Sequence, residues 1–230
     1  GRQSGLKRDT STGFLAGLDL SSWRTTQKEL AKKVIQEDRF NRPLRLIAGV
    51  DTAYVAGNAF SAAVVLDFET LEPVETEVAK CAVNVPYIPT FLSFRELDPM
   101  IKVILKLGKK ADIFLVNAHG IAHPERCGCA SHLGVVLDIP TVGVASRVLY
   151  GSVANSEDAD IKYLKDGEEV IGVALVTMPG SRPVYVSVGH RVSLRTTIEI
   201  VRRTTRGNRM PEPLRLAHVA SNEARKKLGK

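Results

Sequence analysis

The chain has 230 residues, 44% of them hydrophobic, which is enough to bury the core of one large domain. We expect a single, monomeric domain over 1–230, with a polar leader over 1–20 and a basic tail over 219–230. The sequence has no apolar run as long as a membrane span and no signal-peptide core near its start, so we expect a cytoplasmic protein without a membrane partner. Three cysteines do not indicate a disulfide framework.

The formal charge is +7, and its excess is concentrated near the C-terminus. Residues 191–230 contain eleven Lys and Arg against three Glu, a net charge of +8. A localised basic field attracts polyanions, and nucleic acid is the first candidate. A solvated basic helix explains the same charge equally well, so charge alone leaves both interpretations open.

The first half of the chain predicts a helix, three strands and a second helix. Residues 21–40 have helical apolar spacing, with Ser21 or Ser22 as the cap. Three β-branched runs then predict an antiparallel meander of strands over 44–54, 60–68 and 74–85. After a loop with two prolines, a helix is expected from Ser93 to Gly108.

From residue 111 to 149 apolar strands alternate with a helix, which predicts crossover connections and a parallel part of the sheet, and further strands and a helix follow. The expected strands cover 111–120, 140–149, 168–178 and 183–189, and the expected helices cover 129–139 and 193–205, the latter capped by Ser193. Together these elements predict an α/β fold of the ribonuclease H-like kind. Its mixed sheet would combine a three-stranded antiparallel meander with parallel strands, flanked by helices.

The stretch HGIAHPERCGCASH, residues 119–132, gathers five side chains that could bind a soft metal: His119, His123, Cys127, Cys129 and His132. Its spacing argues against a zinc site, because the two cysteines are one residue apart and the chain has no second cysteine pair. The alternative is a loop that enters a helix near Cys129.

Three oxygen-bearing side chains suggest a second kind of metal site. Asp51 lies inside an apolar strand, where a carboxylate is costly unless it is paired or coordinated. Glu96 begins a helix, where it could face the sheet or simply complement the helix dipole. Asn117 ends a strand of the predicted parallel part. If the three converge, they form an oxygen site suited to Mg²⁺ and phosphate chemistry, weakened because Asn117 offers only a neutral carbonyl.

Several runs, in order and with similar spacing, closely resemble the endonuclease V family of ribonuclease H-like nucleases, which act near inosine in DNA or RNA. They are IAGVDTAY, FSAAVVLDF, VPYIPTFLSFRE, HGIAHP, ASHLGVVLDIPTVGVA and VSVGHRVSL. The resemblance covers about residues 23–218. It implies a metal-dependent endonuclease that recognises inosine and hydrolyses a nearby phosphodiester in DNA repair or RNA processing.

The resemblance also implies roles for particular residues. Asp51 and Glu96 would be catalytic carboxylates that hold Mg²⁺ or Mn²⁺, with Asn117 completing the site. His218 would be a further active-site histidine, although an exposed histidine in a basic helix is the plain alternative. The wedge that enters nucleic acid beside the lesion would be Pro86, Tyr87, Ile88 and Pro89. The base pocket would be formed by His119, Gly120, Ile121, Ala122 and His123, with His123 near the metal and the two small residues admitting the flipped base.

Two positions depart from the family pattern. The family usually has an aspartate where this chain has Asn117 and a lysine where it has Ser146. Arg147 could replace the lysine only through a local irregularity, since neighbouring side chains in a strand point to opposite faces. The departures favour an alternative function, a catalytically weakened or inactive protein of the same fold that binds inosine-containing nucleic acid.

Overall fold

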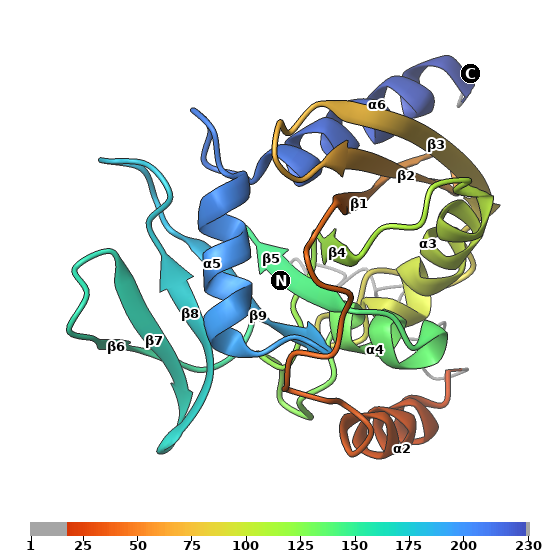
Figure 1. The fold of residues 1–230 in the computed structure, drawn as a ribbon. Coiled ribbons are helices and arrows are strands. Elements are labelled where there is room, and N and C mark those ends of the chain that lie inside the picture. The colour runs from red at the N-terminus through yellow and green to blue at the C-terminus, as the bar shows by residue number, and fades with distance from the viewer. Residues whose placement is uncertain (1–17, 229–230) are drawn as a thin grey trace, which may run out of the picture.

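The computed structural model describes residues 18–228, and a nine-stranded mixed sheet runs through the molecule (Figure 1). The strands are β1 (Leu46–Val55), β2 (Asn58–Asp67), β3 (Pro73–Ala82), β4 (Ile113–Val116), β5 (Thr141–Ala145), β6 (Ser152–Asn155), β7 (Ile161–Asp166), β8 (Glu169–Leu175) and β9 (Val184–His190). The helices are α2 (Leu20–Ala31), α3 (Ser93–Lys106), α4 (Cys129–Leu137), α5 (Leu194–Thr204) and α6 (Glu212–Leu228). None of these described helices is long and apolar enough to cross a membrane.

The strand order β3-β2-β1-β4-β5-β9-β8-β7-β6 confirms the predicted mixed sheet. The meander is antiparallel, whereas β1 pairs with β4, and β4 with β5, in parallel. Both parallel pairs are reached through helical connections, as the alternating pattern predicts.

Alternation of side chains along the strands gives the sheet two buried faces. Residues such as Ile47 and Leu115 lie in one core with apolar residues of α5 and α6. Neighbouring residues such as Ala48 and Val116 lie in the other core with apolar residues of α3 and α4. Figure 1 shows α6 lying across β1 and β2, with α3 beside the same strands. The strands that end at the candidate site are therefore covered on both faces.

Several predicted boundaries are wrong, and the strand expected over 111–120 covers only Ile113–Val116. The first helix ends at Ala31 and is capped by Asp19, whose side chain accepts a hydrogen bond from Ser22 N, so neither serine is the cap. The strand expected over 140–149 stops at Ala145, because its partner β9 begins only after Pro183, and proline cannot donate to a ladder. Ser193 caps α5 as predicted.

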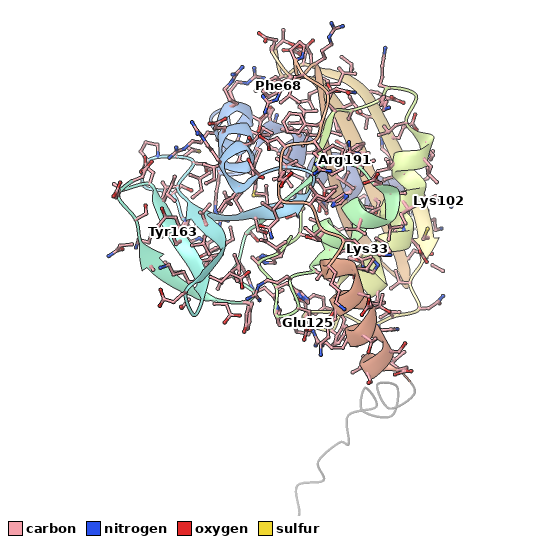
Figure 2. The ribbon with its side chains drawn as sticks, turned by 60° about the horizontal axis from the view of Figure 1, so that its bottom comes forward. Lys33, Phe68, Lys102, Glu125, Tyr163 and Arg191 are labelled. Carbon is pink, nitrogen blue, oxygen red and sulfur yellow. The ribbon has the colours of Figure 1, made fainter. Side chains whose placement is uncertain are left out.

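Strands β6 and β7 were not predicted from the sequence. Their burial pattern is mostly exposed or half-buried, so neither has the continuous apolar run that marks an interior strand. With β8 they form an extension beyond β9, at the left of Figure 1, and Tyr163 of β7 lies on it in Figure 2.

Candidate functional site

Asp51 is placed by the way β1 and α6 approach each other. It shares a face of β1 with Gly49, and a Cβ on Gly49 would lie 2.1 Å from the carbonyl oxygen of Pro213. Only glycine allows this approach, which brings α6 against the strand. The parallel pairing of β1 with β4 ends at Val50, so Asp51 and Asn117 both follow the last paired residues.

Asp51 is only 5% exposed, and both of its carboxylate oxygens accept hydrogen bonds. Oδ1 accepts from Asn117 Nδ2 and from the amide of Thr52, each at 2.9 Å. Oδ2 lies 2.8 Å from Nδ1 of His218, whose side chain is 66% exposed. The structure therefore brings together two residues predicted to act with Asp51, and His218 is the one open to solvent.

Glu96 lies in the first turn of α3 and is held by an aromatic side chain of β1. The hydroxyl of Tyr54 donates a 2.6 Å hydrogen bond to Glu96 Oε1. Burial raises the pKa of Glu96 to about 7, and the nearby charge of Asp51 adds to the rise, while the Tyr54 hydrogen bond and Arg95 oppose it. The guanidinium of Arg95 lies over the Tyr54 ring, 4.1 Å from its centroid. Glu96 and Asp51 are thus neighbouring carboxylates whose charges repel.

This pair of carboxylates fits a divalent cation. Within residues 18–228, no three His, Cys, Asp or Glu side chains are grouped to hold a metal, so a cation would need Asn117 as its third protein ligand. Asn117 presents its amide nitrogen to Asp51, and a half-turn of the amide would present the carbonyl oxygen instead. Carboxylate and amide oxygens are the ligands that Mg²⁺ prefers, and positive charge would relieve the repulsion that raises the pKa of Glu96.

The five soft ligands of residues 119–132 are used in other ways. Cys129 begins α4 as predicted, and burial raises the pKa of the Cys127 thiol to about 12 and that of Cys129 well above its ordinary value. His132 is bonded to the hydroxyl of Ser93 at 2.8 Å. Cysteines of this kind behave as small apolar core residues.

A cavity of about 190 Å³ lies between the start of α3 and the loop that follows β4. It is lined by Tyr87, Pro89, Thr90, Leu92, Ser93, His119, His123, Gly128, Cys129, Arg147, Val148 and Leu149. We call it the base cavity. It adjoins the carboxylates, because Leu92 and Ser93 line it at the start of α3 and Glu96 follows in the first turn of the same helix. Its size suits one flat base better than a larger ligand.

Two neutral histidines line the base cavity. Nε2 of His123 is 2.7 Å from the carbonyl of Thr90, and Nδ1 accepts a hydrogen bond from the amide of Glu125, so the ring carries its proton on Nε2. Burial lowers the pKa of both His119 and His123 to about 4. His119 Nδ1 has no hydrogen-bond partner among the described residues. His123 therefore joins the loop to Thr90.

The remaining predicted pocket residues lie behind this cavity. A Cβ on Gly120 would lie 1.9 Å from the carbonyl oxygen of Val188, so its small size serves the approach of β9. Ala122 packs against Leu164 and Ile171, and Ile121 is also buried. Of the wedge, Tyr87 is 63% exposed, and Tyr87 and Pro89 line the mouth of the cavity.

The predicted lysine position lies in the connection that follows β5. Ser146 and Arg147 are both exposed, and the carbonyl of Ser146 accepts a hydrogen bond from Arg209 at 2.8 Å. Because β5 has already ended, strand alternation no longer prevents Arg147 from lining the base cavity, where the structure places it.

Comparison with known proteins matches the endonuclease V family model over residues 28–219. The chain belongs to the endonuclease V family. It is therefore an enzyme of the nuclease class, as its sequence predicts, and its fold is ribonuclease H-like. A relative named endonuclease V from Dictyoglomus thermophilum is 42% identical over 200 residues, covering 86% of this chain and 87% of the relative.

Solved endonuclease V structures superimpose on nearly the whole chain. The protein from Streptomyces avermitilis has a TM-score of 0.85 at 34% identity, covering 91% of this chain and 94% of that one. The Ciona intestinalis protein, solved in complex with a 24mer DNA containing an inosine followed by a ribo-adenosine, has a TM-score of 0.83 at 30% identity. That match covers 91% of this chain and 98% of the other.

The sequence alone did not single out three residues of this endonuclease V chain. Tyr54 donates to Glu96, Thr90 accepts from His123, and Arg126 donates to the carbonyl of His123 at 3.1 Å. Tyr54 is half-buried near the end of β1, three residues after Asp51, and its contact with Glu96 spans 42 residues of the chain. The contact of Thr90 with His123 spans 33 residues of the chain, and Arg126 also donates to Asp166, 40 residues later, so no local pattern indicates these contacts.

Proposed function

We propose that the chain hydrolyses a phosphodiester close to inosine in DNA or RNA, using Mg²⁺ or Mn²⁺ held by Asp51, Glu96 and Asn117. The observation that carries the proposal is the pair of neighbouring carboxylates directly beside a base-sized cavity lined by two neutral histidines. The Ciona relative was solved with inosine-containing DNA, which supports the same substrate class here. Such activity would serve DNA repair or RNA processing.

The chain's own residues divide the reaction between them. A bound divalent cation would supply an activated water and neutralise charge on the phosphate. Tyr54 holds the carboxylate of Glu96 in place, and Asn117 and the amide of Thr52 orient Asp51. His218 is fixed by Asp51 through Nδ1, and its exposed ring can pass a proton to the leaving oxygen. The products would carry 3′-hydroxyl and 5′-phosphate ends.

The base cavity would hold the extruded hypoxanthine while the wedge replaces its stacking. Burial keeps the rings of His119 and His123 neutral, so both can offer hydrogen-bonding groups to a neutral base without adding charge, while Arg147 also lines the cavity. The exposed ring of Tyr87 at the cavity mouth is available to stack on the bases left behind.

A second function, binding of inosine-containing strands without cleavage, is favoured by one observation. Asn117 donates a hydrogen bond to Asp51 where a third carboxylate would have added negative charge. The site then has two carboxylates instead of three, which lowers its affinity for a divalent cation.

A cleavage assay separates the two functions. Native protein, Asp51→Ala and Asn117→Asp are each incubated with inosine-containing DNA and RNA and with undamaged strands, in Mg²⁺ and then Mn²⁺. We expect native cleavage of the inosine strands, at least a 1000-fold loss in Asp51→Ala, and saturation of Asn117→Asp at about tenfold lower Mg²⁺. The matched control is Asp98→Ala, which removes an exposed carboxylate two residues from Glu96 and should cleave normally.

Binding is measured in parallel by fluorescence anisotropy. If the native protein binds inosine strands but cuts none with either metal, the binding function is supported and the proposed cleavage is overturned. Recovery of cleavage in Asn117→Asp would then show that the missing carboxylate is the cause. Cleavage by Asp51→Ala at the native rate would overturn the assignment of the metal site.

A further inference from the structure

Helix α2 buries only one side chain, and that side chain is polar. Gln27 is 0% exposed, whereas an amphipathic helix normally docks through several buried apolar residues. A buried amide is costly unless it is hydrogen-bonded. Gln27 meets this need at both ends: its Nε2 donates to the carbonyl of Thr90 at 2.6 Å, and its Oε1 accepts from Arg24 at 3.0 Å. The buried contact of α2 is therefore directed at Thr90.

Thr90 directly follows the wedge and has a backbone conformation that a β-branched residue rarely adopts. Its φ is +71°, a strained value for threonine. Its carbonyl receives two donors, Gln27 Nε2 and His123 Nε2, and its hydroxyl accepts from Arg24 at 3.0 Å. Strained backbone persists where surrounding contacts over-determine it, and three contacts from two distant segments meet here.

Aromatic packing fixes the helix beside this residue. The Trp23 ring stacks on Phe94 with centroids 4.4 Å apart and planes 4° apart, and the Arg24 guanidinium lies 4.2 Å from the centroid of Phe91. Figure 1 shows α2 at the rim of the molecule beside α4, and Figure 2 shows Glu125, two residues after His123, on the same side. The helix thus borders both the wedge and the loop of the base cavity.

The other end of the wedge is also anchored. Arg95 NH1 donates to the carbonyl of Val85 at 3.0 Å, immediately before Pro86. The wedge is therefore held at both ends while Tyr87 at its tip stays 63% exposed. A loop fixed in its working conformation loses less entropy when it engages a ligand.

We propose that Gln27 and Arg24 are positioning residues that brace the wedge through Thr90 and thereby set the affinity for inosine-containing strands. The family match begins at residue 28, so both residues lie outside it. The inference rests on the proposed function for its consequence, because the wedge matters only if it enters nucleic acid. The brace itself is a property of the free protein.

The first experiment measures the brace without any substrate. Hydrogen exchange is followed at the amide of Phe91, which donates to the carbonyl of Ile88 across the wedge base at 3.0 Å. In Gln27→Leu we expect the amide of Phe91 to exchange about fivefold faster, because about one net hydrogen bond is lost. Exchange in β1 and β4 should not change. Thr25→Ala is the matched control, because this exposed hydroxyl bonds only to Ser21 of its own helix. Unchanged exchange in Gln27→Leu would overturn the brace.

The second experiment measures its consequence. We expect Gln27→Leu to raise KM for an inosine-containing strand about fivefold and leave kcat unchanged, because the brace does not touch the carboxylates. Trp23 is the only tryptophan, so native emission would show that α2 remains docked in the variant. Arg24→Met, which removes the donor to the Thr90 hydroxyl from outside the cavity lining, should act in the same direction even if Gln27→Leu folds poorly.

The outcomes separate the two proposals. Faster exchange with raised KM and constant kcat supports the brace and its role. Faster exchange with unchanged KM, or an equal fall in kcat, overturns the role in substrate binding. A native protein that neither binds nor cuts inosine strands overturns the proposed function, and the exchange rates then decide the brace by themselves.

Discussion

The carboxylate pair and the base cavity lie side by side, but burial shifts their titrating groups in opposite directions. It raises the pKa of Glu96 to about 7 and lowers the pKa of His119 and His123 to about 4. In each case burial disfavours the charged form. Around Glu96 the shift is increased by the charge of Asp51, whereas His123 is held near two arginines, Arg24 and Arg126, that oppose its protonation.

The opposite pKa shifts indicate which kind of ligand each region fits. The two carboxylates repel each other, and Arg95 only partly offsets the resulting rise in the pKa of Glu96, which is the condition of a cation site. The cavity has two neutral histidine rings, and hydrogen bonds to Thr90 and Glu125 fix the ring of His123, which suits a site for an uncharged base. Substitutions at the carboxylates should therefore impair cleavage without impairing binding of the base, and substitutions in the cavity should impair binding first.

The largest expected effect is the loss of cleavage in Glu96→Gln. The amide keeps an acceptor for Tyr54 but removes one of the two charges that would hold the cation. We expect cleavage to fall about 1000-fold, roughly 4 kcal/mol of transition-state stabilisation, while binding of an inosine strand changes less than about twofold. Single-turnover cleavage and anisotropy measure the two quantities.

The free energy of unfolding is the control for that variant. Replacing a repelled carboxylate by an amide should leave stability unchanged or slightly higher at neutral pH. If Glu96→Gln lost binding and cleavage together, the carboxylates would also be recognising the base, and the separation of the two regions would be wrong.

The sequence predicted the fold, and it singled out candidate site residues that the structure brings together around Asp51. Periodicity predicted the meander, the alternation of strand and helix over 111–149 and the helix that starts at Cys129. Asp51 was indicated by its cost inside an apolar strand, and the structure places Asn117 and His218 in contact with it. These inferences depend on patterns among neighbouring residues, which can be seen directly in the sequence.

The sequence could not predict contacts between distant segments. Gly120 reads as space for a ligand, yet the carbonyl of Val188, 68 residues later, fills the space. Gln27 reads as a solvent-facing residue of a polar helix, yet it is fully buried against Thr90. The exposed strands β6 and β7 have no apolar alternation strong enough to be detected.

The second prediction uses the opposite pKa shifts to distinguish the regions by acid stability. His119, His123 and His132 each have a folded pKa of about 4, below the ordinary 6.5, so the unfolded chain binds more protons between these values. Stability from the histidines is therefore present above pH 6.5 and is lost as the pH falls toward 4. Glu96 acts oppositely, since its folded pKa of about 7 lies above the ordinary 4.5.

Between pH 6.5 and 4.5 the three histidines outweigh the single carboxyl by two protons. The free energy of unfolding should fall by at most about 2.7 kcal/mol per pH unit in metal-free buffer, measured by urea denaturation. Glu96→Gln should steepen this slope, and His132→Asn, whose amide can still reach the Ser93 hydroxyl, should flatten it by a similar amount. A flat profile over this range would show that the histidines are not buried as neutral rings.

The smallest expected effect concerns Arg126, which ties the base cavity to the β7–β8 hairpin and has no counterpart at the carboxylates. Its guanidinium donates to Asp166 at 2.6 Å and Glu169 at 2.7 Å, and to the carbonyl of His123 at 3.1 Å, while the side chain is 23% exposed. Because its carboxylate partners are more open to solvent, Arg126→Gln should cost only about 1–2 kcal/mol of unfolding free energy. Arg202→Gln, which breaks a single exposed ion pair with Asp158, is the matched control and should cost less than about 0.5 kcal/mol. Equal losses in the two variants would mean that Arg126 is an ordinary surface pair, and that the cavity loop is held by His123 and Thr90 without help from the hairpin.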